Sequence, residues 1–373
     1  AADGSVVYFS STADLTERSH GQGRASLYRY GVDSGDLLDL TVAPELPEGP
    51  RVQDVLALSE DGSHVYFSAA GALVAGAPEN PLDANLYLWH EDEIEWIGTT
   101  KGAAWEFAGP SKRLASPGGR YFAFSVFSAL TPDDVPSPSC PSDPVHLNPP
   151  GDCEDVYLYD SVADELTCVS CDGPGLGFST LGGTMFRPWG FGDEQGRGVL
   201  DDGTVFFESP NRLLRADTDA FTDVYSWRHG ELSLLSPGTD GAPASFGDAT
   251  ADGGTVFIRT AEPLLPADVD LGVDVYAVRE GGGLLAQHPP SVPPGCPPEA
   301  CRDPLPLAAG PPAIASDRPR AGSNLPRRCA RLARRGRAAV RAARRLEGER
   351  AQRRLATGRR LLGEARRCAR SGP

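Results

Sequence analysis

Short apolar runs, each preceded by a polar turn, recur five times in the first 288 residues of the chain. The runs are β-branched and aromatic, which favours buried strands. The turns carry Gly, usually after Asp. Gly tolerates a positive φ and Asp caps its own backbone, so these turns connect strands tightly. The five copies are "DGSVVYFSS" at Asp3, "EDGSHVYFSAA" at Glu60, "PGGRYFAFSV" at Pro117, "DDGTVFFES" at Asp201 and "ADGGTVFIRT" at Ala251.

A second pattern, a strand followed by a turn and another strand, alternates with the first throughout. In "DVYLYD", for example, successive side chains point to opposite faces, so Val156 and Leu158 face one way while Tyr157 and Tyr159 face the other. Both faces of such a strand are apolar and need cover. The five copies of this pattern begin at Ser26, Asn85, Asp155, Asp223 and Asp274.

Each repeat therefore predicts about four short strands, one of them before the Asp-Gly turn, as in "VLALS" at Val55. One such unit cannot bury its own faces, but radial stacking of the units can. We predict an all-β fold, a β-propeller of four-stranded blades. No strand precedes Asp3, so we expect an N-terminally truncated propeller with roughly six or seven blades in the full protein. The blades are predicted at about residues 1–43, 51–100, 105–172, 185–238 and 244–288.

These motifs resemble a known repeat. The frame "S-x-D-G-x-x-V-Y-F-S", followed by "D-V-Y-x-Y/W" and a second turn, is similar to the TolB-type propeller repeat, which is related to WD-repeat propellers. The variant with "ADTD…TDVYSW" and "ELTCVSCD" resembles secreted propeller proteins of high-GC Gram-positive (actinobacterial) bacteria. The resemblance implies a propeller over residues 1 to about 288. It does not specify a function, because propellers host many unrelated activities.

Two aspartate trios occupy the same place in successive repeats, inside "LLRADTDAFTDVYSW" and "LLPADVDLGVDVYAV". The favoured interpretation is that their carboxylates accept backbone N–H bonds and hold a tight loop. The alternative is a Ca²⁺ site, since carboxylate oxygens suit a hard cation. An EF-hand is excluded, because Thr222 and Arg228 stand where that loop needs Gly and Glu. The two trios are Asp217, Asp219 and Asp223, and Asp268, Asp270 and Asp274.

The eight cysteines fall into four local pairs. In an oxidising compartment such pairs form disulfides, so we expect a secreted or cell-surface protein. The rival interpretation is metal binding: Cys168 and Cys171 have the spacing of half a zinc site, although no second half follows. The four predicted bridges are Cys140–Cys153, Cys168–Cys171, Cys296–Cys301 and Cys329–Cys368.

The charge is distributed unevenly. The net charge of −16 combines +14 over residues 327–373 with −30 over the rest, which argues against nucleic-acid binding by the propeller. Residues 289–326 contain 12 prolines and predict an extended linker. Apolar residues at 3–4 spacing then predict a basic helix over 327–370, folded back at Gly348 so that Cys329 meets Cys368. The alternative is a solvated arginine tail. The sequence contains no stretch of 18 apolar residues, so it predicts no membrane span.

No catalytic motif emerges. The six histidines are scattered without ligand spacing, and no G-x-S-x-G or H-E-x-x-H is present. The third repeat carries a Pro- and Ser-rich insertion that would be clipped by Cys140–Cys153, and it is our predicted recognition loop. We predict a non-enzymatic, extracytoplasmic scaffold that binds a protein or an anionic envelope polymer. The alternatives are a hydrolase or lyase acting in the propeller funnel and a calcium-stabilised surface protein. No cofactor other than Ca²⁺ is expected.

Overall fold

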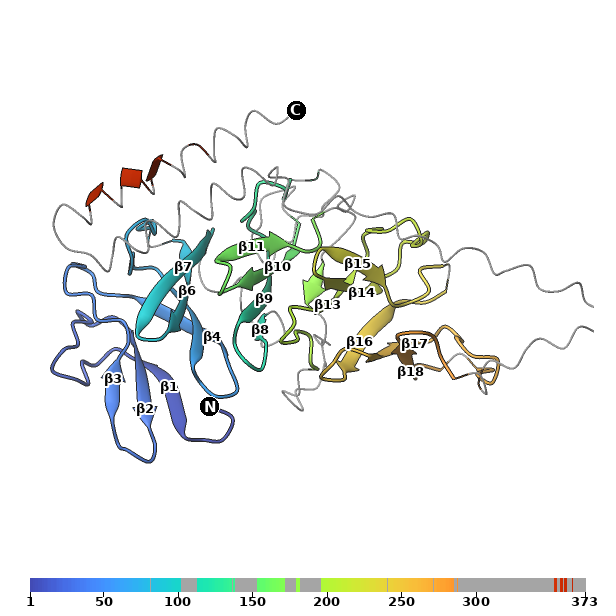
Figure 1. The fold of residues 1–373 in the computed structure, drawn as a ribbon, viewed down its shortest axis with the longest axis horizontal. Helices are drawn as coiled ribbons and strands as arrows, with labels where there is room; N and C mark the ends of the chain where they lie inside the picture. Colours follow the sequence, from blue (N-terminus) through green and yellow to red (C-terminus); the bar gives the residue numbers. More distant parts are fainter. Residues whose placement is uncertain are drawn as a thin grey trace, which may run out of the picture. The chain divides into compact units, whose positions relative to one another are not determined.

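The computed structural model divides into two units, Ala1–Pro304 and Leu305–Pro373. The described residues are 1–80, 82–101, 113–135, 137, 153–171, 179–181, 196–239, 241–270, 272–284, 287, 352–353, 356–357, 359–360 and 364. In the first unit they form five antiparallel sheets, which follow one another in chain order (Figure 1). The chain is therefore all-β over its first unit, as predicted.

Within every sheet, each strand pairs with the next strand of the sequence. The first sheet contains β1 (Val6–Ser11), β2 (Ser26–Gly31) and β3 (Leu37–Asp39). The second contains β4 (Val52–Leu58), β5 (His64–Ala69), β6 (Ala84–His90) and β7 (Glu93–Thr100). The third contains β8 (Arg113–Ala115), β9 (Tyr121–Val126), β10 (Asp155–Asp160) and β11 (Glu165–Cys168). The fourth contains β12 (Thr180–Leu181), β13 (Val205–Ser209), β14 (Asp223–Arg228) and β15 (Glu231–Leu234), and the fifth contains β16 (Ala244–Ala249), β17 (Thr255–Thr260) and β18 (Asp274–Arg279).

Among the described residues, three sheets have four strands and two have three. The first sheet begins with the strand that follows the Asp-Gly turn, as the sequence pattern predicts. The fourth sheet begins with β12, ahead of the predicted blade start at residue 185. The predicted fourth strand of the fifth blade does not occur among the described residues after β18.

The Asp-Gly turns form the corners predicted for them. In the second sheet the peptide N–H of Gly62 donates to Ser59 O at 3.0 Å, and Gly62 has a φ of 70°. The carboxylate of Asp61 accepts the hydroxyl of Ser59 at 2.7 Å and the peptide N–H of Ser63 at 2.9 Å. These bonds lower the pKa of Asp61 to about 2, because they stabilise its charged form.

The corners of successive sheets are joined by hydrogen bonds. Ala2 N donates to Glu60 O at 2.7 Å, and Glu60 N donates to Pro117 O at 2.9 Å. Gly118 N continues the row by donating to the Asp201 carboxylate at 2.7 Å. The turns that the sequence identifies by their glycines thus also link the first four sheets to one another.

Each inner sheet is covered on both faces by its neighbours. Tyr157 and Tyr159 of β10 pack with Tyr66 and other residues of the second sheet, whereas Val156 and Leu158 pack with the fourth sheet. This confirms the alternation predicted for "DVYLYD". Two further core clusters join the first sheet to the second and the fourth to the fifth. Face-to-face stacking of consecutive sheets is the packing expected of propeller blades.

The C-terminal unit is helical at residues 352–353, 356–357, 359–360 and 364. Arg360 and Glu364 lie one helical turn apart, with 3.8 Å between the guanidinium and the carboxylate. The predicted linker, the fold at Gly348 and the Cys329–Cys368 bridge lie outside the described residues. Within the part of the chain that the structure describes, no helix combines the length and apolarity needed to cross a bilayer.

Candidate metal site and the tyrosine corners around it

One buried tyrosine recurs in every sheet, in β2, β6, β10, β14 and β18, and fixes the loop that leads to that strand. We call these residues the corner tyrosines: Tyr28, Tyr87, Tyr157, Tyr225 and Tyr276. In the first four, the hydroxyl donates to a carbonyl in the preceding loop. The acceptors are Ala13 O at 2.9 Å, Gly71 O at 2.7 Å, Ser128 O at 3.2 Å and Asn211 O at 3.0 Å, respectively.

A peptide N–H in the same loop donates back to the hydroxyl. Leu73 N donates to Tyr87 at 3.1 Å, and Leu130 N donates to Tyr157 at 3.2 Å. Burial raises the pKa of Tyr87 to about 12, because the phenolate would be poorly solvated there. The corner tyrosines therefore act as neutral hydrogen-bonding groups that fix loop geometry.

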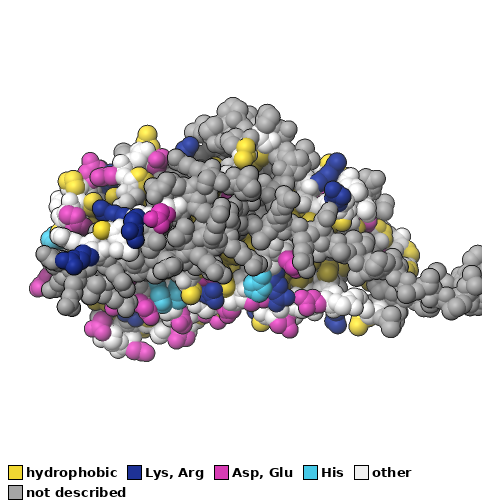
Figure 2. All heavy atoms as spheres, turned by 45° about the horizontal axis from the view of Figure 1, so that its top comes forward, with side chains coloured by type: hydrophobic (Ala, Val, Ile, Leu, Met, Phe, Trp, Pro, Cys, Tyr) yellow, Lys and Arg dark blue, Asp and Glu magenta, His cyan; other side chains and the backbone are white. Residues whose placement is uncertain are grey.

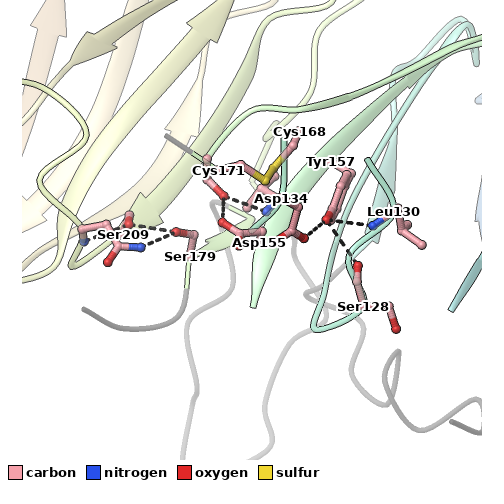
Figure 3. Close-up of a disulfide and its surroundings, with 12 residues drawn as sticks. Ser128, Leu130, Asp134, Asp155, Tyr157, Cys168, Cys171, Ser179 and Ser209 are labelled. Carbon is pink, nitrogen blue, oxygen red and sulfur yellow. Dashed lines mark hydrogen bonds between the residues drawn. A yellow bond between two sulfur atoms is a disulfide. The ribbon is translucent and has the colours of Figure 1, made fainter. Parts of the chain in front are cut away.

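In the last three repeats a carboxylate joins this arrangement. The hydroxyls of Tyr157, Tyr225 and Tyr276 make short hydrogen bonds to Asp134, Asp217 and Asp268, respectively. Figure 3 shows the third-sheet example, in which the Tyr157 hydroxyl lies between Asp134, Ser128 and Leu130. Asp134 is not recognisable in the sequence as a member of this series, because the insertion in the third repeat changes its spacing to the strand.

A second aspartate opens the same strand in the third and fourth sheets. Asp155 accepts the hydroxyl of Ser170 at 2.6 Å, and Ser170 in turn accepts the peptide N–H of Val156 at 2.9 Å. Asp223 and Ser236 repeat this pair, with Val224 N donating to Ser236 at 2.9 Å. Burial raises the pKa of Asp155 and of Asp223 to about 6 each, because desolvation disfavours their charged forms.

The fourth sheet adds a third aspartate to this pair. Asp219 accepts the peptide N–H of Phe221 at 2.8 Å, and the Arg212 guanidinium donates to the Asp219 carbonyl. Ligand oxygens of Asp217, Asp219 and Asp223 all lie within 4.8 Å of one another. The exposed fractions of these residues are 3%, 7% and 3%. The structure thus brings the first predicted aspartate trio together in a buried cluster.

The second predicted trio also converges, but at the surface. Ligand oxygens of Asp268, Asp270 and Asp274 lie within 4.8 Å of one another. Asp268 is half-buried, whereas Asp270 and Asp274 are exposed. Gly272 N donates to Asp270 at 2.7 Å, which is a loop-capping bond of the predicted kind. Cation binding by either trio stays a prediction.

Cys168 and Cys171 form a disulfide, with their Cα atoms 5.7 Å apart. This pairing was predicted, and it excludes the half-zinc interpretation because neither sulfur is a thiolate. Asp155 lies beside the two cysteines (Figure 3). It accepts a hydrogen bond from Ser170, which lies between them in the sequence. Of the other predicted cysteine pairs, only Cys153 lies within the described residues, where it is buried. Cys140, Cys296, Cys301, Cys329 and Cys368 lie outside them.

Sequence spacing missed one pair of histidines. His64 and His90 stack across β5 and β6, with ring centroids 3.7 Å apart. They are directly paired in the strand register, which sequence distance does not reveal. Burial and the neighbouring His90 charge both lower the pKa of His64.

No family model matches the chain, and no curated protein matches it. Solved structures similar to it include TolB proteins, which have β-propeller folds. For TolB from Acinetobacter baumannii, identity is 14%, coverage is 75% of this chain and 51% of that one, and the TM-score is 0.32. For the putative TolB from Agrobacterium tumefaciens, identity is 14%, coverage is 76% of both chains, and the TM-score is 0.33.

An oligogalacturonate lyase from Vibrio parahaemolyticus is similar at 9% identity, covering 75% of this chain and 61% of that one with a TM-score of 0.35. The chain spans about half the length of the first TolB structure. With TM-scores this low, we assign the fold from the strand pairing and the core clusters described above.

Proposed function

We propose that the chain is an extracytoplasmic, non-enzymatic binding scaffold, and that it recognises its partner through the segment between β9 and β10. The observation that supports this proposal is the fixation of both ends of that segment by buried hydrogen bonds. The segment covers residues 127–154, whereas the equivalent segment of the fourth sheet covers residues 210–222. An insertion at a rigid base is a common way to build a recognition surface.

The two ends are held by different groups. The last residue of the segment, Glu154, accepts a hydrogen bond from the Ser125 hydroxyl at 2.9 Å, and both residues are buried. Near the start of the segment, the hydroxyl of the corner tyrosine Tyr157 makes hydrogen bonds to the Ser128 carbonyl and the Asp134 carboxylate. A buried polar network with its bonds made is rigid, so the segment begins and ends at fixed positions.

The cysteine chemistry supports the proposed compartment. The Cys168–Cys171 disulfide favours an oxidising environment, because cytosolic thiols are kept reduced. The distribution of charge on the surface bears on the kind of partner. Acidic side chains gather along the lower edge of the face in Figure 2, which disfavours a polyanionic partner on that edge. We infer that the partner is an envelope protein or, through the basic C-terminal segment, an anionic envelope polymer.

A loop replacement tests this proposal. Residues 135–153 would be replaced by a short Gly-Ser linker that keeps Asp134 and Glu154. Binding to an isolated envelope fraction and to purified anionic wall polymer would be measured by co-sedimentation. We expect retention on the envelope fraction to fall on the order of tenfold, as for loss of a binding hot spot.

The matched control changes a surface turn elsewhere. Glu91 and Asp92 both have a positive φ, of 51° and 59°, so Glu91→Asn with Asp92→Gly suits that turn. This control should bind like the parent. Equal binding by a loop variant that melts at the parent temperature would contradict the proposal. Turnover of a peptide or polysaccharide substrate by the parent chain would favour the hydrolase or lyase alternative instead.

A further inference from the structure

Two carboxylate oxygens in the buried trio make no hydrogen bond of normal geometry. Asp217 Oδ1 and Asp223 Oδ2 are both shielded from solvent, and their residues are at least nine-tenths buried. Buried polar atoms without partners are rare in folded proteins, since each one costs the free energy of its desolvation. An oxygen of this kind indicates a missing partner at the cluster.

The opposite oxygens of these carboxylates are occupied. Tyr225 holds the other oxygen of Asp217, and Ser236 holds the other oxygen of Asp223. One oxygen of Asp219 accepts the Phe221 N–H. Hydrogen bonds of this type orient carboxylates that bind a metal, while the second oxygen of each group is left for the ion.

The oxygens lie close enough together to bind one ion. Ca²⁺–oxygen bonds are about 2.4 Å long, so two oxygens bound to the same ion are at most about 4.8 Å apart. The three carboxylates offer oxygens within 4.8 Å of one another. A magnesium ion would need shorter bonds and a stricter octahedron.

The charge balance also favours a cation. Three carboxylates lie together in a buried site, and among the described residues the charge of Arg212 acts on one of them, Asp217. Buried charges of one sign are costly unless a counter-ion is present. A divalent ion would supply that charge and would also satisfy the two unpaired oxygens.

The surrounding loop is fixed in place. Thr218 N donates to Gly238 O at 2.8 Å, which ties the Asp217–Asp223 loop to the residues that follow β15. Gly238 has a φ of 63°, and a Cβ there would lie 2.9 Å from the Asp217 Cα. A side chain larger than that of Gly at position 238 would therefore collide with the backbone of Asp217.

We propose that Asp217, Asp219 and Asp223 form a binding site for one divalent cation of the Ca²⁺ class, which holds together the loop that leads into β14. The role of the ion is structural. Its partners are the carboxylate oxygens that the protein leaves free.

The chain contains its own control. The trio of Asp268, Asp270 and Asp274 has the same residue types and the same close oxygens, but water reaches two of its members. Exposed acidic groups are solvated without an ion, so we expect this second trio to bind far more weakly.

The test uses the full-length chain after removal of metals with a chelator. Terbium(III), a luminescent substitute for Ca²⁺, would be titrated in with excitation of tyrosine, because Tyr225 contacts Asp217 directly. We expect saturable luminescence that Ca²⁺ displaces, and a rise in melting temperature on adding Ca²⁺ that EDTA reverses. The variant Asp219→Asn should weaken binding by on the order of tenfold or more, whereas the matched variant Asp270→Asn should bind like the parent.

Each result decides the proposal. No saturable signal and no Ca²⁺-dependent change in melting temperature of the parent chain would overturn it, as would unchanged binding by Asp219→Asn. Loss of binding in Asp270→Asn alone would place the ion in the fifth sheet and overturn the assignment. If Asp219→Asn does not fold, the EDTA-reversible shift of the parent and the intact Asp270→Asn control still decide the outcome.

Discussion

The hydroxyl of Tyr66 donates to the carbonyl oxygen of Gly119 at 2.6 Å, joining β5 of the second sheet to the corner of the third. Tyr8 makes the same contact one sheet earlier, with Gly62. Tyr66 is fully buried, and its ring also stacks on Phe122 with centroids 4.3 Å apart. The corner glycines therefore serve two purposes: they make the turn, and they present a bare carbonyl to the preceding sheet.

The substitution Tyr66→Phe tests this contact. It keeps the ring and its stacking on Phe122 but leaves the buried Gly119 carbonyl without its donor. We expect the free energy of unfolding to fall by about 1–3 kcal/mol, measured by urea denaturation. Tyr30→Phe, on the partly exposed Tyr30 of β2, is the control and should change little. Equal stability of Tyr66→Phe and the parent would show that this bond contributes nothing.

The carboxyl of Glu208 should make the free energy of unfolding depend on pH. It accepts the Phe246 N–H at 2.8 Å between the fourth and fifth sheets, and burial raises its pKa to about 7 from 4.5. The folded chain therefore binds this proton more tightly than the unfolded chain. Stability should be fully present below about pH 4.5 and should fall by about 2–3 kcal/mol as the pH rises through 7. Denaturant midpoints between pH 4.5 and 8 measure the loss.

Glu208→Gln is the matched variant, because the amide keeps the acceptor oxygen and cannot ionise. It should remove this part of the pH dependence and be more stable than the parent at pH 8. A parent and variant with parallel profiles would contradict the assignment.

The stacked histidines predict that stability changes with pH in the opposite direction. The pKa of His64 is lowered, chiefly by burial, so the folded chain binds its proton less tightly than the unfolded chain. The stability that neutral His64 contributes to the fold is present above about pH 6.5 and is lost as the pH falls below that value. Melting temperatures between pH 7.5 and 5.5 should fall less for His64→Gln than for the parent. His229→Gln, at an exposed turn, should follow the parent profile.

The mass of the unreduced chain tests the prediction of an oxidising compartment. Four disulfides lower the mass of the unreduced chain by about 8 Da relative to the reduced chain, because each bridge removes two hydrogens. Peptide mapping should recover Cys168 linked to Cys171 and test the other three predicted pairs. Eight free thiols in protein isolated from its native source would rule out an oxidising compartment.

Much of the fold could be read from local patterns. The Asp-Gly turns, the apolar runs after them and the two-sided strand "DVYLYD" predicted sheets that stack face to face, and Val156 and Tyr157 do pack on different neighbours. The short strand β12, with only Thr180 and Leu181, had no such signal. Its position depends on pairing with β13, which local sequence does not encode.

The burial of the candidate site could not be predicted from the sequence. Both aspartate trios have the same residues at the same spacing, so the sequence treats them alike. In the structure the Asp217 trio is buried beside Ser236 and Gly238, the segment after β15, whereas β18 is the last described strand of the fifth sheet. The pairing of His64 with His90 likewise needed the strand register.

The sequence by itself determined the strands, the corners and the faces, because these follow from backbone sterics and the two-residue period of a strand. Tertiary structure decided which carboxylates lose their water and which tyrosine meets which carbonyl, because burial depends on the segments that pack over a residue from elsewhere in the chain.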